Sequence, residues 1–258
     1  MTFSTAEITA FVGAYVWAFA RISAMMMTAP IFSSQSLPIR FRITLALVCT
    51  VVMVPMLPEL PAIDFLSGES LLIMVNQIII GSIMGFTLQL VFSVLVLSGQ
   101  ILAMQAGLGF SMMNSPQDGV QITVVGQLYV MIATLLFLAM DGHLLLIQMI
   151  FDSFYQIPIG LAGINAQGFW LFVSWGSNFY KHAVMVVMPA IAALLMVNIS
   201  FGVMAKASPQ LNPFSVGFVI TIIFGFIIVL LTLPNLAPYF SKLVEEGFSL
   251  AQAILTAK

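Results

Sequence analysis

The stretch Gly202–Phe218, which reads GVMAKASPQLNPFSVGF, is a short polar connection between two long apolar runs, 177–204 and 214–236. Each run has about 20 residues or more, enough for an α-helix to cross the hydrocarbon core of a bilayer. Proline stops a helix, and the residue before a proline favours extended geometry, so Pro209 and Pro213 make the connection a rigid turn. The sequence therefore predicts a membrane-type helical hairpin with a defined tip.

Three further blocks of the sequence are informative beside this one. They are Arg21–Arg42 (RISAMMMTAPIFSSQSLPIRFR), Gly99–Gly119 (GQILAMQAGLGFSMMNSPQDG) and Asp141–Gly160 (DGHLLLIQMIFDSFYQIPIG). With Gly202–Phe218 they resemble, in order, the motifs of the FliR/SctT family, the R subunit of the flagellar and type III secretion export gate. The blocks span most of the chain and are specific when taken together. The small departures are Lys206, where the family more often has Arg, and Val219, where it more often has Pro.

The resemblance implies an all-α protein of membrane-type helical hairpins, assembled into a hetero-oligomeric export gate that lies partly above the membrane plane. It implies FliP and FliQ homologues as partners, together with FlhB and FlhA homologues and unfolded exported substrates. It places the chain in the bacterial inner (cytoplasmic) membrane, at the flagellar basal body. An injectisome gate subunit is the alternative within the family, and an autonomous six-helix transporter or a structural scaffold is the alternative outside it.

Composition favours the same class without the resemblance. The chain is 61% hydrophobic and 6% charged, against roughly 25% charged residues in soluble domains. A net charge of −2 and the lack of a basic cluster argue against a nucleic-acid partner. The single Cys49 precludes a disulfide within the chain. The first apolar stretch continues past about 15 residues and contains Arg21, so we do not expect a removable signal peptide.

Apolar runs predict about six long helices in one domain over residues 1–258. The runs are 8–28, 42–58, 71–98, 124–151, 177–204 and 214–236. The tail, about 238–258, mixes Lys and Glu with Phe and Leu, which suits an interfacial or partner-facing amphipathic helix. Glycines and a serine at Gly81, Gly85 and Ser82 allow close approach between helices. Amides inside the runs, such as Asn76 and Gln77, need partners, either within this chain or in a neighbouring subunit.

The central loop, about 105–122, is the predicted gating element. Glycine permits unusual backbone torsions, and methionine fills irregular holes and releases them. Composition alone favours an ordinary interhelical loop over a pore seal. Because the family's loop is a plug, the resemblance implies a plug here. The residues concerned are Gly107, Gly109, Phe110, Met112, Met113 and Pro116.

A second set of residues is predicted to serve assembly or structure. Arg21 lies within an apolar run, where a cation is costly unless it reaches water, a partner or, by snorkelling, an interface. Arg40 and Arg42 follow Pro38 and mark a helix entry, and Lys206 can interact with the last carbonyls of a helix. The full set is Arg21, Pro30, Pro38, Arg40, Arg42, Lys206, Pro209, Gln210 and Asn212.

No catalytic, cofactor or metal site is predicted. Gly107-Leu108-Gly109 lacks the third glycine and the preceding strand of a nucleotide-binding loop, and His143 and His182 are isolated from other ligands. The carboxylates are expected near loops or helix ends, which speaks against a proton-coupled carrier. Energy for export would then come from partners.

Overall fold

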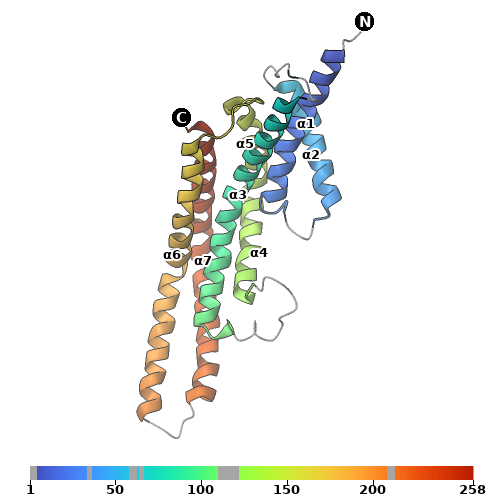
Figure 1. Ribbon diagram of the computed structural model, residues 1–258. Helices are drawn as coiled ribbons and strands as arrows, with labels where there is room; N and C mark the ends of the chain where they lie inside the picture. Colours follow the sequence, from blue (N-terminus) through green and yellow to red (C-terminus); the bar gives the residue numbers. More distant parts are fainter. Residues whose placement is uncertain are drawn as a thin grey trace. The chain divides into compact units, whose positions relative to one another are not determined.

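The computed structural model describes residues 5–33, 37–57, 63, 67–109, 122–207 and 213–257. Within these ranges the chain forms α-helices and short 3₁₀ turns and has no strand, so the prediction of an all-α protein is confirmed (Figure 1). The elements are α1 Thr5–Thr28, α2 Ile39–Met53, η1 Val54–Met56, α3 Gly68–Gln105, α4 Val124–Ala139, α5 Gly142–Gln156, α6 Ala166–Ala207 and α7 Pro213–Thr256.

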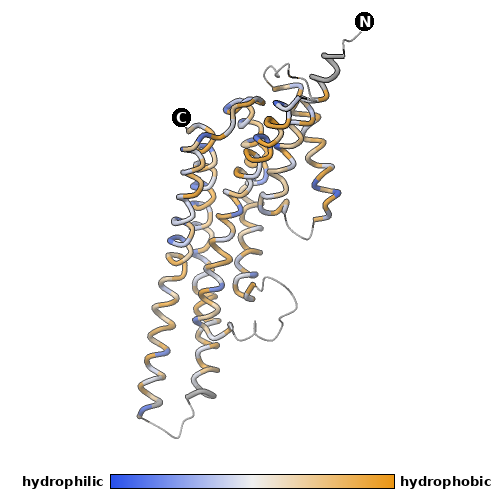
Figure 2. The backbone as a smooth tube through the Cα atoms, in the orientation of Figure 1, coloured by the Kyte–Doolittle hydropathy of each residue, from blue (hydrophilic) through white to orange (hydrophobic). Residues whose placement is uncertain are grey.

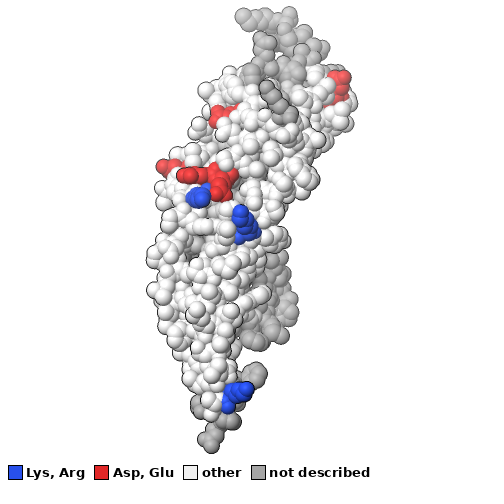
Figure 3. Space-filling view, turned by 90° about the vertical axis from the view of Figure 1, so that its left-hand side faces the viewer, with Lys and Arg blue, Asp and Glu red and all other residues white. Residues whose placement is uncertain are grey.

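Four stretches of helix in the described residues are long and apolar enough to cross a membrane. They are Ile39–Met56, Gly68–Gln105, Ala166–Met204 and Gly217–Thr256, and the bent pair α4–α5 would make a fifth if it formed one span. Apolar residues follow most of the length of α6 and α7 (Figure 2). On the face drawn in Figure 3, charged side chains are few and most of the surface is uncharged. The membrane-type character predicted from composition therefore holds.

The prediction of one helix over 124–151 is wrong. The run is divided into α4 and α5, which are separated at Met140 and Asp141. Asp141 at the break adopts a left-handed conformation, with φ 55° and ψ 25°, which aspartate tolerates better than most residues. Its carbonyl oxygen accepts the N–H groups of Leu144 and Leu145, so the same residue starts α5. Hydropathy could not show this break, because both sides of it are apolar.

The chain divides into two compact units, and α3, α6 and α7 each contribute to both. The first unit contains residues 1–90, 140–176 and 244–258, and the second contains 91–139 and 177–243. Helix α7 continues without interruption through the tail region to Thr256. Phe240, Leu243 and Leu255 of this region are buried.

In the first unit, α1 and α3 approach closely at two glycines. A Cβ atom at Gly81 would collide with the backbone carbonyl of Arg21, and one at Gly85 would collide with the hydroxyl of Thr28. The Thr28 hydroxyl lies 3.3 Å from the carbonyl oxygen of Ser82, to which it donates. The close approach expected at these small residues is confirmed.

The start of α6 is attached to the end of α7 in the same unit. Asn165 precedes α6, and its Oδ1 accepts the N–H of Gly168 at 2.7 Å, as an N-capping side chain does. Its Nδ2 donates to the carbonyl oxygen of Ala257 at 2.9 Å. A Cβ atom at Gly168 would lie 2.8 Å from the carbonyl oxygen of Ile254, so glycine is needed for this contact.

The core of the second unit is built around aromatic rings from α3, α4 and α7. The ring of Phe92 packs edge-to-face on those of Phe137 and Phe240, with centroids 5.4 and 5.3 Å apart. Ser98 on α3 donates to the carbonyl oxygen of Ala183 on α6 at 3.0 Å. The hydroxyls of Tyr129 and Thr232 lie 3.1 Å apart and join α4 to α7.

The glycine contact between α1 and α3 gives a stability test. We expect Gly81→Ala to destabilise the chain by about 1–3 kcal/mol, because the added methyl group overpacks the helix crossing. Gly176→Ala in α6 is the matched control, since nothing lies within 4 Å of its added Cβ. That change should be neutral or stabilising by up to about 1 kcal/mol. Thermal unfolding in detergent, monitored by circular dichroism, measures the stability of both variants. An equal change of stability in the two variants would contradict the close crossing at Gly81.

Candidate functional site

The structure describes the central loop at its two ends. Residues 105–109 and 122–123 are described, and among the predicted plug residues these include Gly107 and Gly109. Phe110, Met112, Met113 and Pro116 lie outside the described residues. The site is therefore the pair of anchors that hold the loop, both of which belong to the second unit.

The first anchor lies where the chain leaves α3. Ala106 is buried, and a Cβ atom at Gly225 of α7 would press on its side chain, so the two residues meet closely. Gly107 has φ 77°, a left-handed conformation that favours glycine. A Cβ atom there would lie 3.3 Å from the ring of Phe218. The chain thus turns out of α3 while it remains in contact with α7.

The second anchor lies where the chain enters α4. The hydroxyl of Thr123 accepts the N–H of Gly126 at 3.1 Å, which caps the helix, and it donates to the carbonyl oxygen of Gly99 on α3 at 3.4 Å. A Cβ atom at Gly99 would collide with the backbone of Gly126, so α3 and α4 touch backbone to backbone here. Both ends of the loop are consequently fixed on the helices of one unit.

Sequence reasoning identified Gly107 but missed the other anchor residues. Thr123 stands directly before an apolar run, which is a helix-capping signal that was available in the sequence. Gly99, Gly126 and Gly225 could not be paired with their neighbours without the fold. The anchors are made of small and neutral groups, so they can hold a segment but offer no acid, base or nucleophile.

The second site is a buried hydrogen-bond cluster around Arg21, in the first unit. Its side chain is completely buried and makes four hydrogen bonds. Nε donates to Gln77 Oε1 at 2.7 Å, Nη1 donates to the carbonyl and hydroxyl oxygens of Ser153 at 2.9 and 3.1 Å, and Nη2 donates to the carbonyl oxygen of Ile157 at 2.9 Å. The guanidinium carbon lies 4.3 Å from the centre of the Phe154 ring. Arg21 therefore does not snorkel to an interface.

All four acceptors are neutral oxygens, and three of them belong to the end of α5. The last carbonyls of a helix carry partial negative charge and lack partners within the helix, so a cation is stabilised there. Helix α1 is not among the candidate spans in the described residues. Burial lowers the pKa of Arg21 to about 9, so the guanidinium remains charged at neutral pH. Arg21 thus caps α5 from α1 and holds Gln77 of α3 in the same cluster.

The remaining predicted assembly residues lie at helix ends. Pro30 follows the end of α1, and Pro38 precedes α2 and accepts the N–H of Phe41 at 2.9 Å. Arg42 donates to the carbonyl oxygen of Leu37 at 3.1 Å, whereas Arg40 is exposed. Lys206 is exposed in the last turn of α6, where the helix dipole favours a cation. Pro209, Gln210 and Asn212 lie outside the described residues.

The described residues were compared for clusters of possible metal ligands. There, no group of three or more His, Cys, Asp or Glu side chains comes together. The carboxylates were expected near loops or helix ends, but Glu245 and Glu246 lie within α7 and Asp152 lies on the last turns of α5.

Arg21 gives a test of the helix cap. We expect Arg21→Ala to destabilise the chain by about 3 kcal/mol or more, because several buried acceptors would lose their donor. Arg40→Ala removes the same side chain from an exposed position and should change stability by about 0.5 kcal/mol or less. Thermal unfolding of the purified variants measures the two changes in stability. A similar loss for both variants would show that the buried network is not important for stability.

Comparison with known proteins places the chain in a family. Residues 12–247 match the family model described as bacterial export proteins, family 1. The chain is 33% identical over 256 residues to the flagellar biosynthetic protein FliR of Pectobacterium carotovorum subsp. carotovorum, covering 99% of this chain and 98% of the relative. It is 34% identical to FliR of Escherichia coli (strain K12) over 94% of this chain and 92% of the relative. A more distant relative is FliR of Bacillus subtilis (strain 168), at 27% identity over 84% of this chain and 85% of the relative. The chain therefore belongs to family 1 of the bacterial export proteins.

Proposed function

We propose that this chain is a non-enzymatic core subunit of the flagellar type III protein export gate. It assembles with FliP and FliQ homologues into the closed channel through which unfolded flagellar substrates are exported, and it works beside FlhB and FlhA homologues. The complex lies in the bacterial inner membrane at the flagellar basal body. The central loop of this chain acts as the plug of the closed channel.

The observation that carries this proposal is the match to flagellar FliR proteins along almost the whole chain. The matches to two such proteins cover 92% or more of each relative and 94% or more of this chain. The flagellar branch is favoured over the injectisome branch because the relatives carry flagellar names.

Exposed apolar surface supports an assembled state. Large apolar side chains on α6 and α7 are exposed, and they include Trp170, Met196 and Val203 on α6 and Leu230 and Leu231 on α7. Exposed apolar surface of this kind marks contact with a membrane or with another protein. In a hetero-oligomeric gate, lipid would cover part of this surface and the neighbouring subunits would cover the rest.

The anchored loop suits a plug. Its two ends are held in the second unit by the Ala106–Gly225 contact and by the Thr123 cap. Phenylalanine and methionine in the segment between them are bulky and adaptable enough to exclude water and ions. A closed state favoured by a few kcal/mol would suppress leakage, and partners that bind the open state better would shift the population.

Assembly is tested by producing the chain with and without its FliP and FliQ homologues and measuring the native mass. We expect a defined hetero-oligomer that contains this chain, because its exposed apolar faces need partners. A stable monomer or homo-oligomer that is indifferent to both homologues would instead support the autonomous transporter.

The plug is tested by deleting residues 107–118 in cells that produce the whole gate. We expect ion leakage across the membrane, because the channel would lose its seal, measured as the decay of an ion gradient. A milder variant replaces Met112 and Met113 by serine and leaves both loop anchors intact. An ion-tight membrane in both variants, with the gate assembled normally, would exclude the plug.

A further inference from the structure

A groove between α1 and α2, in the first unit, is not used by the central loop or by the Arg21 cluster. The two helices lie side by side (Figure 1). The groove has a volume of about 280 Å³, and its wall is apolar throughout. A polar ligand would lose its water there without gaining a hydrogen bond, so the groove suits an apolar chain. The lining residues are Tyr15, Val16, Phe19, Leu47, Thr50 and Val51.

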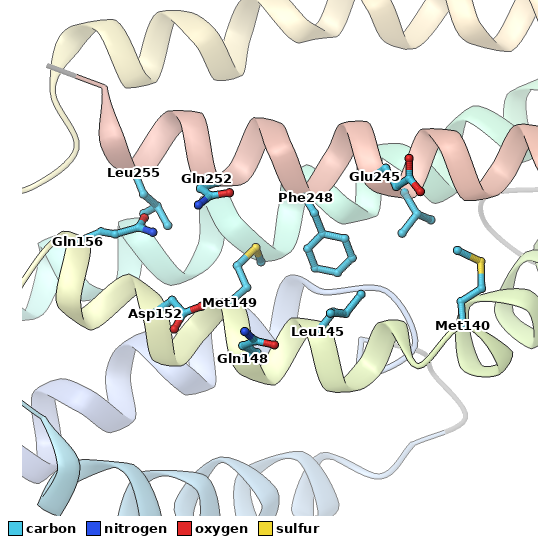
Figure 4. A pocket seen from close by; sticks show the side chains of 11 residues that line it. Met140, Leu145, Gln148, Met149, Asp152, Gln156, Glu245, Phe248, Gln252 and Leu255 are labelled. Atoms are coloured by element: carbon cyan, nitrogen blue, oxygen red, sulfur yellow. The ribbon is translucent and has the colours of Figure 1, made fainter.

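The groove between α5 and the last part of α7, in the same unit, has a different chemistry. Apolar side chains such as Met149 and Phe248 share it with polar ones, among them Gln148, Asp152 and Gln252 (Figure 4). Water can hydrogen-bond to such a mixed surface, whereas it gains nothing from an apolar wall. Of the two grooves, the one between α1 and α2 therefore has the greater need for an apolar occupant.

Helix α2 has the length and composition of a membrane span. Ile39–Met56 is one of the four candidate spans in the described residues, and its 18 residues extend about 27 Å, close to the thickness of a hydrocarbon core. Only 22% of this stretch is buried within the chain. Leu47 and Val51, which form the α2 wall of the groove, are each 52% exposed. The groove therefore opens on a surface that lipid can cover.

A cation lies beyond the groove on the same side of α2. Arg40 is exposed, and it precedes Leu47 by seven residues and Val51 by eleven. At 3.6 residues per turn these spacings place all three on one side of the helix, with Arg40 about 16 Å from Val51 along the axis. The first turn of α2 contains no acidic residue, and residues 43–57 carry no charge. An anion beside Arg40 would therefore meet a positive charge and no negative one.

The position of Arg40 corresponds to the level of lipid headgroups. Arginines at the ends of membrane spans lie there, with the charge in the polar layer and the stem along apolar surface. Because helix side chains lean toward the N-terminus, the Arg40 guanidinium points away from the groove and beyond the start of α2. An occupant that meets both features needs a long apolar chain and an anionic head.

The size of the groove separates a lipid chain from a helix of a partner protein. A helix about 10 Å wide that extended over 16 Å would occupy more than about 1,000 Å³. The groove has about 280 Å³, so it is too narrow for a helix and suits a single chain. The apolar surface of α1 continues toward the turn that joins the two helices, since Met27, eleven residues after Val16, is 46% exposed.

We infer that this groove holds one acyl chain of an anionic phospholipid, whose phosphate group lies beside Arg40. The inference goes beyond the proposed function, because it assigns a lipid-binding site to this chain. It requires a membrane and does not require the gate. A chain that forms no hetero-oligomer can still bind lipid there, and a hetero-oligomer can form while the groove binds none.

Photolabelling in vesicles tests the site. The full chain, alone and together with its FliP and FliQ homologues, is placed in phosphatidylcholine vesicles that contain a small fraction of phosphatidylglycerol with a photoreactive acyl chain. Mass spectrometry then locates the labelled residues. We expect label at Phe19 and Leu47, and about 10-fold less at Leu231 of α7, which is 69% exposed and does not line the groove.

Three results of this experiment would overturn the inference. Equal labelling of Leu231 and Leu47 would show contact with bulk lipid only. Label in the groove of the chain alone, but not of the chain with its homologues, would show that a partner protein covers the groove. An unlabelled groove in both preparations would show that no lipid binds there.

A matched pair of variants tests the place of the acyl chain. Val51→Trp fills the groove and should reduce labelling of Phe19 by about 10-fold or more, because the indole ring takes the place of the chain. Val52→Trp adds the same ring at the next position, which is 62% exposed and outside the groove, and should leave the labelling unchanged. Equal labelling in the two variants would contradict the site.

A second pair tests the anionic head. Arg40→Gln should reduce labelling by the photoreactive phosphatidylglycerol by about 5-fold, the effect of one arginine near an anionic membrane surface. Labelling by phosphatidylcholine with the same photoreactive chain should not change. Lys206→Gln removes an exposed cation from the last turn of α6 and is the control. The same labelling in Arg40→Gln and Lys206→Gln would refute the contact between the phosphate group and Arg40.

Discussion

The buried guanidinium of Arg21 is the constraint on which the first unit depends. Removing a charge from water costs several kcal/mol, and only good hydrogen-bond geometry offsets that cost. Here the donors reach Gln77 on α3 and the final carbonyls of α5, and the Phe154 ring lies against the charge. Because the charge is stable only when all of these groups converge, the cluster specifies how α1, α3 and α5 meet.

The same constraint helps to fix the position of α5. Helix α5 begins at the left-handed Asp141 and ends at the carbonyls that Arg21 caps, so both ends of a 15-residue helix are set by specific contacts. Ser153 and Phe154 are on the buried side of α5, whereas Asp152 is exposed. The Arg21 contact therefore helps to determine which side of α5 is buried.

The sequence was sufficient for the features that depend on local pattern. Long apolar runs predicted the helices, and Gly81 and Gly85 predicted a close crossing that the structure contains. It was not sufficient for features that join distant residues. Ser153 is 132 positions from Arg21, and Thr123 reaches Gly99 across the central loop. The bend at Asp141 was missed for another reason, since the hydrophobicity of a run does not report a single left-handed residue within it.

A plug must remain in place when closed and yet be able to move. The contacts that hold the two ends of the central loop are made by Ala106, Gly107 and Thr123 with Gly99, Phe218 and Gly225. Of these residues, Gly107 belongs to the proposed plug, and the others lie outside 110–121, the part of the loop between the described anchors. Displacing that segment would therefore break none of the described anchor contacts. In the proposed plug, the contacts of residues 110–121 with partner proteins would then determine the free-energy difference between the closed and open states. The anchors would hold the two ends of the loop in both states.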